Sequence, residues 1–337
     1  MAVTIKQIAA LAGVSRGTVD RVLHNRPNVH PLAHKKVQDA IRALGYTREE
    51  KSTVAKTVVM LIPQWQDGHF NRQLISGLRH AQRYIADESF QLIEQPLYTM
   101  TTQELLQAMN KHLQNGVDGL IVRAENTPEM RQAIERATSE GVTVITYDAD
   151  VPDSGRLCHI GQELWRAGGI AAGIMAKLIR PPEHVLVVAG NMRLEAHKGR
   201  LDGFCRRLRA LGFDADAYRI IETNEMHHLT SELVAHALNE DSSLRAIYMA
   251  TQPIAGCIEG IQRAHAHPVR PHVICNDLTP TAKRYLREGA VDFVIGQAFD
   301  QESFRAAVAM YQMLMRGKRP EKEVYYTDLS LISREML

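Results

Sequence analysis

The chain has 337 residues, of which 45% are hydrophobic. This is enough for two or three domains with buried cores and too apolar for a disordered protein. The 40 Lys and Arg residues nearly balance the 38 Asp and Glu residues, so the net charge of +2 says little about partners. Residues 1–48 differ from the rest, because eight basic and two acidic residues give them a net charge of +6, against −4 for the remainder. This asymmetry predicts a polyanion-binding head on a nearly neutral body.

The four cysteines are far apart and lack C-x-x-C and metal-ligand spacings. Their spacing argues against a disulfide scaffold or a zinc site and favours a reducing compartment. No apolar run approaches the roughly 18–20 residues that cross a bilayer, and the first residues show no export signal. We therefore expect a cytoplasmic protein with no cofactor, no metal and no membrane partner.

The sequence of residues 4–45 predicts three short amphipathic helices. Thr4 can cap the first helix, and Gly13 can adopt the positive φ that ends it. Ser15 is a good N-cap for a second helix over 16–23, and Pro31 opens a third helix that ends before Gly45. Apolar residues at helical spacing form the predicted inner faces: Ile5, Ile8, Ala9, Ala12, Val19, Val22, Leu23, Val37, Ala40, Ile41 and Leu44.

The second predicted helix leaves Arg16, Gly17, Asp20, Arg21 and His24 on its outer face. Its length suits a recognition helix that lies in the major groove of DNA with its N-terminal residues at base edges. Arg16 and Arg21 carry guanidinium forks that match guanine O6 and N7. Phosphate contacts, which position a protein without reading sequence, are predicted for Thr4, Ser15, Thr18, Asn25 and the backbone at Val29 and His30. The alternative is a three-helix bundle without DNA, which the local charge disfavours.

The segment TIKQIAALAGVSRGTVDRVLHNRPNV resembles the DNA-binding head of the lactose-repressor (LacI/GalR) family of bacterial transcription regulators. The matching residues are Ala9, Ala12, Gly13, Val14, Ser15, Thr18, Val19, Arg21, Val22 and Leu23. The resemblance implies that Arg16 and Gly17 are base-reading positions and that Arg21 is the recognition arginine. Gly17 has no side chain and Asp20 stands where the family has a small residue, so we expect an unfamiliar operator sequence.

Residues 49–57 form a polar linker before the first predicted strand. Family members have a longer segment here, whose leucine wedges into the minor groove at the operator centre. This linker is shorter and contains no leucine, and Val54 is its apolar candidate. The sequence therefore allows two predictions for this linker, a short hinge helix or a solvated tether.

From Val58 onward, short apolar runs alternate with amphipathic segments. The runs are rich in β-branched residues and bounded by turns, which predicts parallel strands over 58–62, 90–94, 117–122, 142–147, 184–190, 217–222, 245–250, 272–277 and 292–297. Helices are predicted over 72–86, 102–115, 128–140, 164–179, 200–211, 231–239 and 255–266. The fold class is therefore an all-α helix-turn-helix head followed by an α/β core of two doubly wound parallel-sheet lobes.

The body over 58–330 is similar to the sugar-binding core of the same family and to periplasmic ribose-type binding proteins. The resemblance implies a periplasmic-binding-protein-like core in which the chain crosses between the lobes three times, here near Ala149, Gln297 and Tyr325. The predicted parts are a helix-turn-helix domain over 1–48, a linker over 49–57 and an effector-binding core over 58–337, with lobe 1 at about 58–149 and 298–322 and lobe 2 at about 150–297 and 323–337.

Doubly wound sheets bind ligands beyond the carboxyl ends of their strands, and polar residues follow several predicted strands here. The expected ligand-binding residues are Asp67, Phe70, Asn71, Arg123, Asp148, Arg200, Gln252, Asp277 and Gln297. Carboxylates and arginine forks that chelate adjacent hydroxyls, with an aromatic face against a sugar ring, suit carbohydrate recognition. The alternative role for each is a helix cap or a pair between lobes.

The resemblance implies that Phe70 is the aromatic of the ribose-type motif and that Arg200 lies in the family's ligand-binding arginine motif. It also places Asp277 and Gln297 at ligand positions. Pro253 stands where ribose-type proteins have aspartate, which implies a carbohydrate or polyol other than ribose.

The sequence contains no phosphate-binding loop, zinc-protease motif or nucleophile elbow. Its closest histidine pairs, such as His227 and His228, lack a carboxylate or cysteine at ligand spacing. We therefore predict a non-enzymatic, homodimeric transcription regulator, acting as a repressor, whose binding to a double-stranded DNA operator is modulated by a small carbohydrate or polyol. The alternatives are a cytosolic sugar-binding protein and a sugar-acting enzyme, each with a vestigial DNA-binding head.

Overall fold

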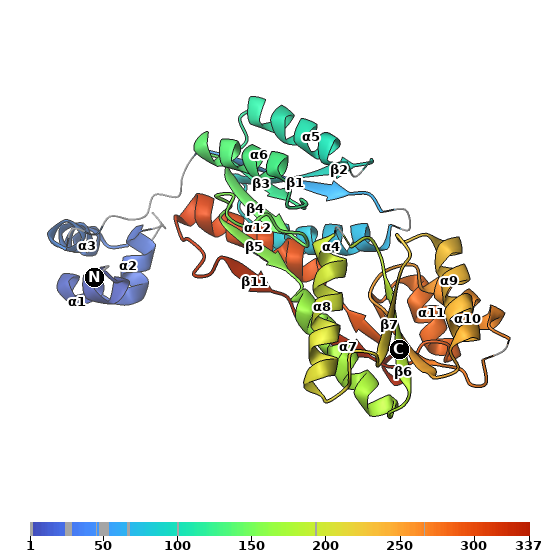
Figure 1. The fold of residues 1–337 in the computed structure, drawn as a ribbon. Coiled ribbons are helices and arrows are strands. Elements are labelled where there is room, and N and C mark those ends of the chain that lie inside the picture. The colour runs from blue at the N-terminus through green and yellow to red at the C-terminus, as the bar shows by residue number, and fades with distance from the viewer. Residues whose placement is uncertain are drawn as a thin grey trace. The chain divides into compact units, whose positions relative to one another are not determined.

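The computed structural model divides the chain into two compact units, residues 1–54 and residues 55–337 (Figure 1). We call them the head and the core. The residues that the structure describes are 3–23, 29–44, 46, 54–65, 68–99, 101–192, 194–265 and 267–337. Most of the predicted linker, residues 49–53, lies outside them.

The head contains three helices, α1 (Ile5–Ala12), α2 (Arg16–Leu23) and α3 (Pro31–Ala43). Thr4 caps α1 through a capping box, in which its side chain accepts from the backbone N–H of Gln7 while the Gln7 side chain accepts from the N–H of Thr4. Gly13 ends α1 in the left-handed conformation, with φ 64°, which glycine adopts without a steric penalty. The sharp turn from α1 to α2 follows from this glycine.

The core of the head is small and apolar, since all three helices bury one face against it. Its buried members are Ile8, Ala9, Ala12, Val19, Val22, Val37 and Ala40, with Leu23, Ile41 and Leu44 packed against them. Ile5, which was predicted on the inner face, is instead exposed over 37% of its surface. It is the first residue of α1, so it lies at the end of the apolar stripe.

The core unit contains two six-stranded sheets. The sheet of lobe 1 is parallel throughout, in the order β11 (Val324–Tyr326), β5 (Cys158–Gly161), β4 (Thr143–Tyr147), β3 (Gly119–Val122), β1 (Lys56–Pro63), β2 (Phe90–Leu97). The sheet of lobe 2 has the order β12 (Ser330–Ile332), β10 (Phe293–Gly296), β9 (His272–Asn276), β8 (Leu244–Met249), β6 (His184–Ala189), β7 (Tyr218–Glu222), with only β12 antiparallel to its neighbour among these described strands.

Helices cover both faces of each sheet, as Figure 1 shows. Lobe 1 has α4 (His69–Ile85) and α12 (Phe299–Arg316) on one face and α5 (Thr102–Gln114) and α6 (Pro128–Ser139) on the other. Lobe 2 has α7 (Leu164–Leu178) and α8 (Glu195–Ala210) on one face and α9 (His227–Glu240), α10 (Ile254–Arg263) and α11 (Pro280–Glu288) on the other. A short 3₁₀ helix, Arg334–Met336, follows β12.

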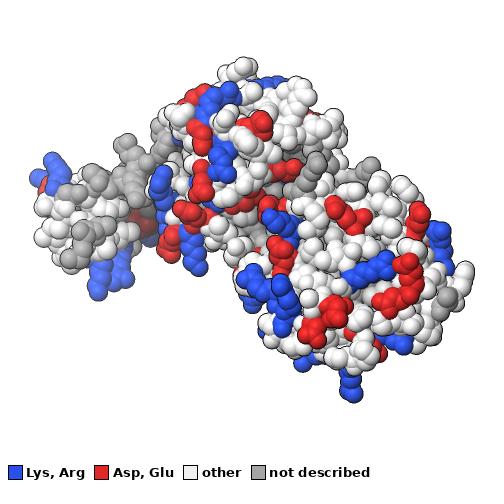
Figure 2. Space-filling model, viewed as in Figure 1, with Lys and Arg blue, Asp and Glu red and all other residues white. Residues whose placement is uncertain are grey.

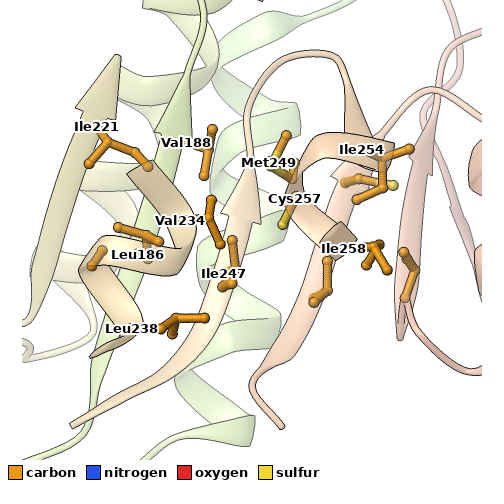
Figure 3. Close-up of a cluster of buried hydrophobic side chains, with 14 of the residues drawn as sticks. Leu186, Val188, Ile221, Val234, Leu238, Ile247, Met249, Ile254, Cys257 and Ile258 are labelled. Atoms are coloured by element: carbon orange, nitrogen blue, oxygen red, sulfur yellow. The ribbon is translucent and has the colours of Figure 1, made fainter. Parts of the chain in front are cut away.

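The central strands are buried on both faces, which explains their continuous apolar runs. Figure 3 shows one such face, where Val188 and Ile247 point toward Val234 of α9 and Cys257 of α10. All four side chains are fully buried. Cores of this kind fix the strands firmly, so the residues just beyond their carboxyl ends are held in place.

The chain leaves lobe 1 for the first time after Gly161, which corrects the predicted crossing near Ala149. The reason is β5, which pairs with β4 on one side and β11 on the other and so belongs to lobe 1. The chain returns to lobe 1 after Gly296 and passes to lobe 2 again after Tyr326, the last residue of β11. The first strand also begins at Lys56 rather than Val58.

Among the described residues, no helix is both long enough and apolar enough to cross a membrane.

Candidate DNA-binding surface and inter-lobe cleft

The second helix of the head presents an exposed polar face. Ser15 starts α2 by accepting from the backbone N–H of Thr18 at 3.1 Å, and the two hydroxyl oxygens lie 2.9 Å apart. Val19 and Val22 turn inward, which leaves Arg16, Gly17 and Arg21 exposed. The helix therefore offers two arginine side chains at the surface, as a helix that reads base edges requires.

Gly17 is not required by packing, because a Cβ there would lie 3.8 Å from the Ser15 hydroxyl oxygen, an ordinary contact distance. Its effect is to leave bare backbone between the two arginines. Figure 2 shows Lys and Arg side chains at the surface of the head.

The predicted phosphate contacts have mixed surroundings. Thr4 and His30 are exposed N-caps, and His30 accepts from the backbone N–H of Leu32 at 3.3 Å. Thr18 and Val29 are half-buried. His24, Asn25 and, in the core, Asp67 lie outside the described residues.

Two aspartates occupy equivalent turns in the two lobes of the core. Asp148 follows β4 and Asp277 follows β9, with φ of 57° and 67°. The backbone N–H of Asp148 donates to the carbonyl of Ile160 at 3.1 Å, and that of Asp277 donates to Ile295 at 2.8 Å. Aspartate is among the few residues that tolerate this left-handed conformation. Each turn places a carboxylate just beyond the carboxyl end of its sheet.

A continuous polar network joins these aspartates across the lobes. The Asp148 carboxylate accepts from Arg123 Nε at 2.5 Å and from Gln297 Nε2 at 2.9 Å. Gln297 Oε1 accepts from Arg200 Nη2 at 3.3 Å, and Arg200 Nη1 lies 3.6 Å from Asp277 Oδ2. Since Gln297 lies in the second crossing, the network connects both lobes through the hinge.

Two further buried side chains extend this network. Gln162, in the first crossing, accepts from Arg200 Nη2 at 2.9 Å, and Glu302 of α12 accepts from Gln297 Nε2 at 2.9 Å. Several buried polar atoms have no hydrogen-bond partner among the described residues: Asn71 Oδ1, Gln162 Nε2, Asn276 Oδ1, Asp277 Oδ1 and Glu302 Oε2. Buried polar atoms are normally paired. Of these five residues, Gln162 is among those that line the inter-lobe cavity, and the other four are not.

The three carboxyl groups of this network differ in their pKa. Burial alone would raise the pKa of Asp148, but Arg123, Gln297 and Arg200 together lower it below its usual value. Burial raises the pKa of Asp277, and this outweighs the lowering by Arg200 and Gln252. Burial and the nearby Asp148 raise the pKa of Glu302 well above its usual value.

A cavity of about 560 Å³ opens beside this network between the two lobes. Arg123, Asn126 and Asp148 line it from lobe 1, and Gln162 and Leu194 line it from the opposite side. This size and mixture of walls are those of a small-molecule site.

Three aromatic rings pack together at the lobe 1 side of the site. The ring centroids of Trp65 and Phe70 lie 5.5 Å apart, and those of Phe70 and Phe299 lie 4.8 Å apart. The guanidinium carbon of Arg123 lies 5.8 Å from the centre of the Trp65 ring. An aromatic surface therefore adjoins the Arg123–Asp148 pair.

The structure brings together five of the predicted ligand-binding residues, Arg123, Asp148, Arg200, Asp277 and Gln297, in one network. Three others lie around it. Phe70 belongs to the aromatic group, and half-buried Gln252 follows β8 close to Asp277. Asn71 is buried and donates to the carbonyl of Pro63, which fixes the end of β1.

The sequence pattern did not indicate Trp65, Gln162 or Glu302. Trp65 stands two residues after β1 and is one of only two tryptophans in the sequence, a signal that could have found it. Gln162 follows β5, a strand that was not predicted. Glu302 lies in the first turn of a helix, where a carboxylate ordinarily favours the helix dipole at the surface.

A capped helix-turn-helix head with exposed arginines, followed by a two-lobed α/β core with a polar inter-lobe cleft, defines the class of two-part bacterial regulatory proteins. Residues 4–49 match the lacI family of bacterial regulatory proteins, and residues 58–319 match the periplasmic binding protein domain. The chain belongs to the lacI family, and its core is a periplasmic binding protein domain.

Two regulators illustrate the likeness. Catabolite control protein A of Priestia megaterium is 26% identical over 78% of each chain. The transcriptional repressor PurR of Vibrio atlanticus is 24% identical over 66% of this chain and 65% of its own length.

Two solved structures share the fold of the core. GanP, a glucose-galactose binding protein from Geobacillus stearothermophilus, matches with a TM-score of 0.72 and 21% identity, covering 84% of this chain and 99% of its own. A periplasmic ribose ABC transporter protein from Conexibacter woesei matches with a TM-score of 0.75 and 19% identity, covering 85% and 94%.

Proposed function

We propose that this regulator is a cytoplasmic, homodimeric repressor whose operator binding is modulated by a small carbohydrate or polyol held between the lobes. The observation that carries the proposal is the buried network that runs from Asp148 through Gln297 and Arg200 to Asp277. Paired carboxylates and arginine forks can chelate adjacent hydroxyl groups, and the aromatic rings beside them suit the apolar face of a sugar. The names of the sugar-binding structures that share the fold agree with this chemistry.

The same network suggests how a ligand would act. Gln297 lies in a crossing and contacts Asp148 of lobe 1 and Arg200 of lobe 2. Its hydrogen bonds therefore depend on the angle between the two lobes. A ligand that bonds to both lobes favours one angle and shifts the population toward it. A shift from about 1:99 to 99:1 requires about 5.5 kcal/mol of differential binding. In a dimer, the changed angle alters the spacing of two heads on adjacent half-sites.

Arg21→Ala should reduce specific DNA binding, because it removes a guanidinium that reads a guanine edge, worth about 1–3 kcal/mol per half-site. The measurement is a mobility-shift titration on duplexes selected from a random pool. Arg42→Ala is the matched control, since Arg42 lies on α3, is largely exposed and pairs with Asp39. A head with no preference for any duplex over random sequence would overturn the regulator assignment.

Arg200→Ala should abolish the response to effector while DNA binding persists, because Arg200 connects Gln162, Gln297 and Asp277. A thermal-shift screen of sugars and polyols identifies the effector, since a specific ligand raises the melting temperature by mass action. Arg200→Lys tests the fork itself, because lysine keeps the charge but loses the bidentate geometry. A normal response of Arg200→Ala to the effector would exclude Arg200 from the site, and turnover of the sugar would favour an enzyme instead.

A further inference from the structure

The outer surface of α7 and α8 forms a groove that the proposed function does not use. It has a volume of about 590 Å³, lies on lobe 2 and shares no lining residue with the inter-lobe cavity. Its apolar walls are made by Trp165, Gly169, Ile170, Gly173 and Ile174 of α7. Trp165 is the largest of these side chains and is exposed over 49% of its surface. An exposed tryptophan above an apolar groove is typical of a binding surface.

The groove exists because α7 and α8 cross with their backbones in contact. A Cβ on Gly168 would lie 1.9 Å from the carbonyl oxygen of Arg200, and one on Gly203 would lie 1.9 Å from that of Trp165. On the outer side, Gly169 and Gly173 lie one helical turn apart, and a Cβ on Gly173 would meet open space. The floor is therefore bare backbone that another helix can approach closely.

Cations surround this groove, and no carboxylate lines it among the residues described there. Arg166 and Lys177 of α7 and Arg206 and Arg207 of α8 all contribute to its lining. Arg166 pairs with Glu163 at 3.3 Å, and the Arg206 guanidinium lies 5.7 Å from the centre of the Trp165 ring. Within the described part of the chain, no carboxylate forms an ion pair with Lys177, Arg206 or Arg207. Figure 2 shows a group of Lys and Arg side chains over α8.

We propose that this groove binds an acidic amphipathic helix of a partner protein. A helix fits because its small and apolar side chains can enter the groove at a spacing of one turn, as in other helix-in-groove complexes. Acidic flanks fit because four cations surround an apolar floor without carboxylates. Arg166 and Lys177 are eleven residues apart on α7, about 16 Å along the helix axis. Cations spread over this length suit a partner segment of about three turns rather than one phosphate group.

The charge of the groove argues against self-association, in which the same groove of a second copy of this chain would be the partner. A two-fold axis through the groove would bring Arg166, Lys177, Arg206 and Arg207 against the same residues of the other copy. Like charges placed opposite one another oppose association. The partner must therefore supply the carboxylates.

The test uses the full chain and a labelled synthetic helical peptide about four turns long. One face of the peptide carries Ala and Leu one turn apart, and its flanks carry Glu. Fluorescence anisotropy should show binding that weakens with added salt, and a peptide with Lys in place of Glu should not bind. The basic head can also attract an acidic peptide, so variants in the groove decide the result.

Gly173→Leu should raise the Kd at least tenfold, because its side chain enters space that is open in the unchanged chain. Arg206→Glu should do the same by reversing a charge at the rim. Lys111→Glu, the matched charge reversal on the exposed surface of α5, should leave the Kd unchanged, and circular dichroism checks that each variant is folded. Equal binding by Gly173→Leu and the unchanged chain would overturn the proposal. A second experiment uses a chain that lacks residues 1–54 and therefore has no DNA-binding head. If single-stranded DNA displaces the peptide from this chain, the groove binds nucleic acid and the proposal is overturned.

Discussion

Asp148 and Asp277 occupy the same kind of turn, but their carboxylates have different surroundings. Asp148 accepts hydrogen bonds from Arg123 and Gln297, which lower its pKa against the effect of burial. Asp277 faces Arg200 at 3.6 Å, and its other oxygen has no partner among the described residues. Asp277 therefore keeps one carboxylate oxygen without a partner in the described part of the chain, whereas Asp148 is the one of the two aspartates that lines the inter-lobe cavity.

Glu302 allows the energetic effect of burying a single carboxyl group to be measured. Its pKa is raised in the folded chain, so Glu302 keeps its proton to a higher pH there than in the unfolded chain. The free energy of unfolding therefore falls as the pH rises from the usual glutamate range through the folded pKa. The slope for one proton is at most about 1.4 kcal/mol per pH unit. Glu302→Gln removes this titrating proton but keeps an oxygen that can accept a hydrogen bond from Gln297. Urea unfolding at several pH values should therefore show that the free energy of unfolding of this variant falls less steeply with pH.

Glu288→Gln is the control, because it removes a carboxyl from the exposed surface of α11. In Glu288→Gln, the free energy of unfolding should fall with pH as steeply as in the unchanged chain. An identical slope in Glu302→Gln and the unchanged chain would show that Glu302 is not the group that takes up the proton.

Residue types at strand ends could be predicted because the chemistry of the cleft and the position of strand ends are both visible in sequence. Arg123, Asp148 and Asp277 were expected for this reason, although their mutual contacts were not. Glu302 could not be predicted, since a glutamate in a first helical turn ordinarily faces water. Only the packing of α12 against lobe 1 buries it.

At the scale of elements, the central strands and most helices follow from the periodicity of apolar residues, but β5 does not. Its sequence, Cys-His-Ile-Gly, has four residues, one β-branched side chain and a histidine. The strand is stabilised by neighbours on both sides, β4 and β11, and its His159 is buried against Thr146 and Asp150. Tertiary contacts therefore override weak local propensity here, and missing β5 displaced the predicted first crossing.

The close crossing of α7 and α8 allows a matched pair of substitutions. Gly168→Ala forces the helices apart, because its Cβ would lie 1.9 Å from a backbone oxygen. We expect the free energy of unfolding to fall by about 1–3 kcal/mol. The response to effector should weaken as well, since the displaced residue is Arg200.

Gly173→Ala is the control on the same helix, where the added methyl meets open space. It should raise the free energy of unfolding by up to about 1 kcal/mol through helix propensity. Chemical denaturation measures both changes. A destabilisation of similar size in the two variants would contradict the assigned difference in packing.

At the scale of the molecule, the head and the core are separate compact units with very different cores. Among its described residues the head buries seven small or medium apolar side chains, whereas each lobe has apolar clusters on both faces of its sheet. Small domains gain less from burial. We expect calorimetry to show a weak transition for the head and a stronger one for the core.

A ligand of the cleft should raise only the transition of the core. At a ligand concentration of 100 times the Kd, mass action adds about 2.7 kcal/mol to the stability of the unit that binds it. The best compound from the thermal-shift screen serves as the ligand, and Arg200→Ala is the matched control. A parallel rise of both transitions would show that head and core unfold as one cooperative unit.

The route of the chain through the two sheets also bears on its biosynthesis. α12 and β11 complete lobe 1, although β1 to β5 leave the ribosome much earlier, and β12 adds the last strand of lobe 2 after that. Lobe 1 therefore cannot complete its apolar core until α12 has been synthesised, because Ala306 and Met310 of α12 are part of that core. Until then it exposes apolar strands that chaperones bind. A premature stop codon before β11 would leave both lobes incomplete.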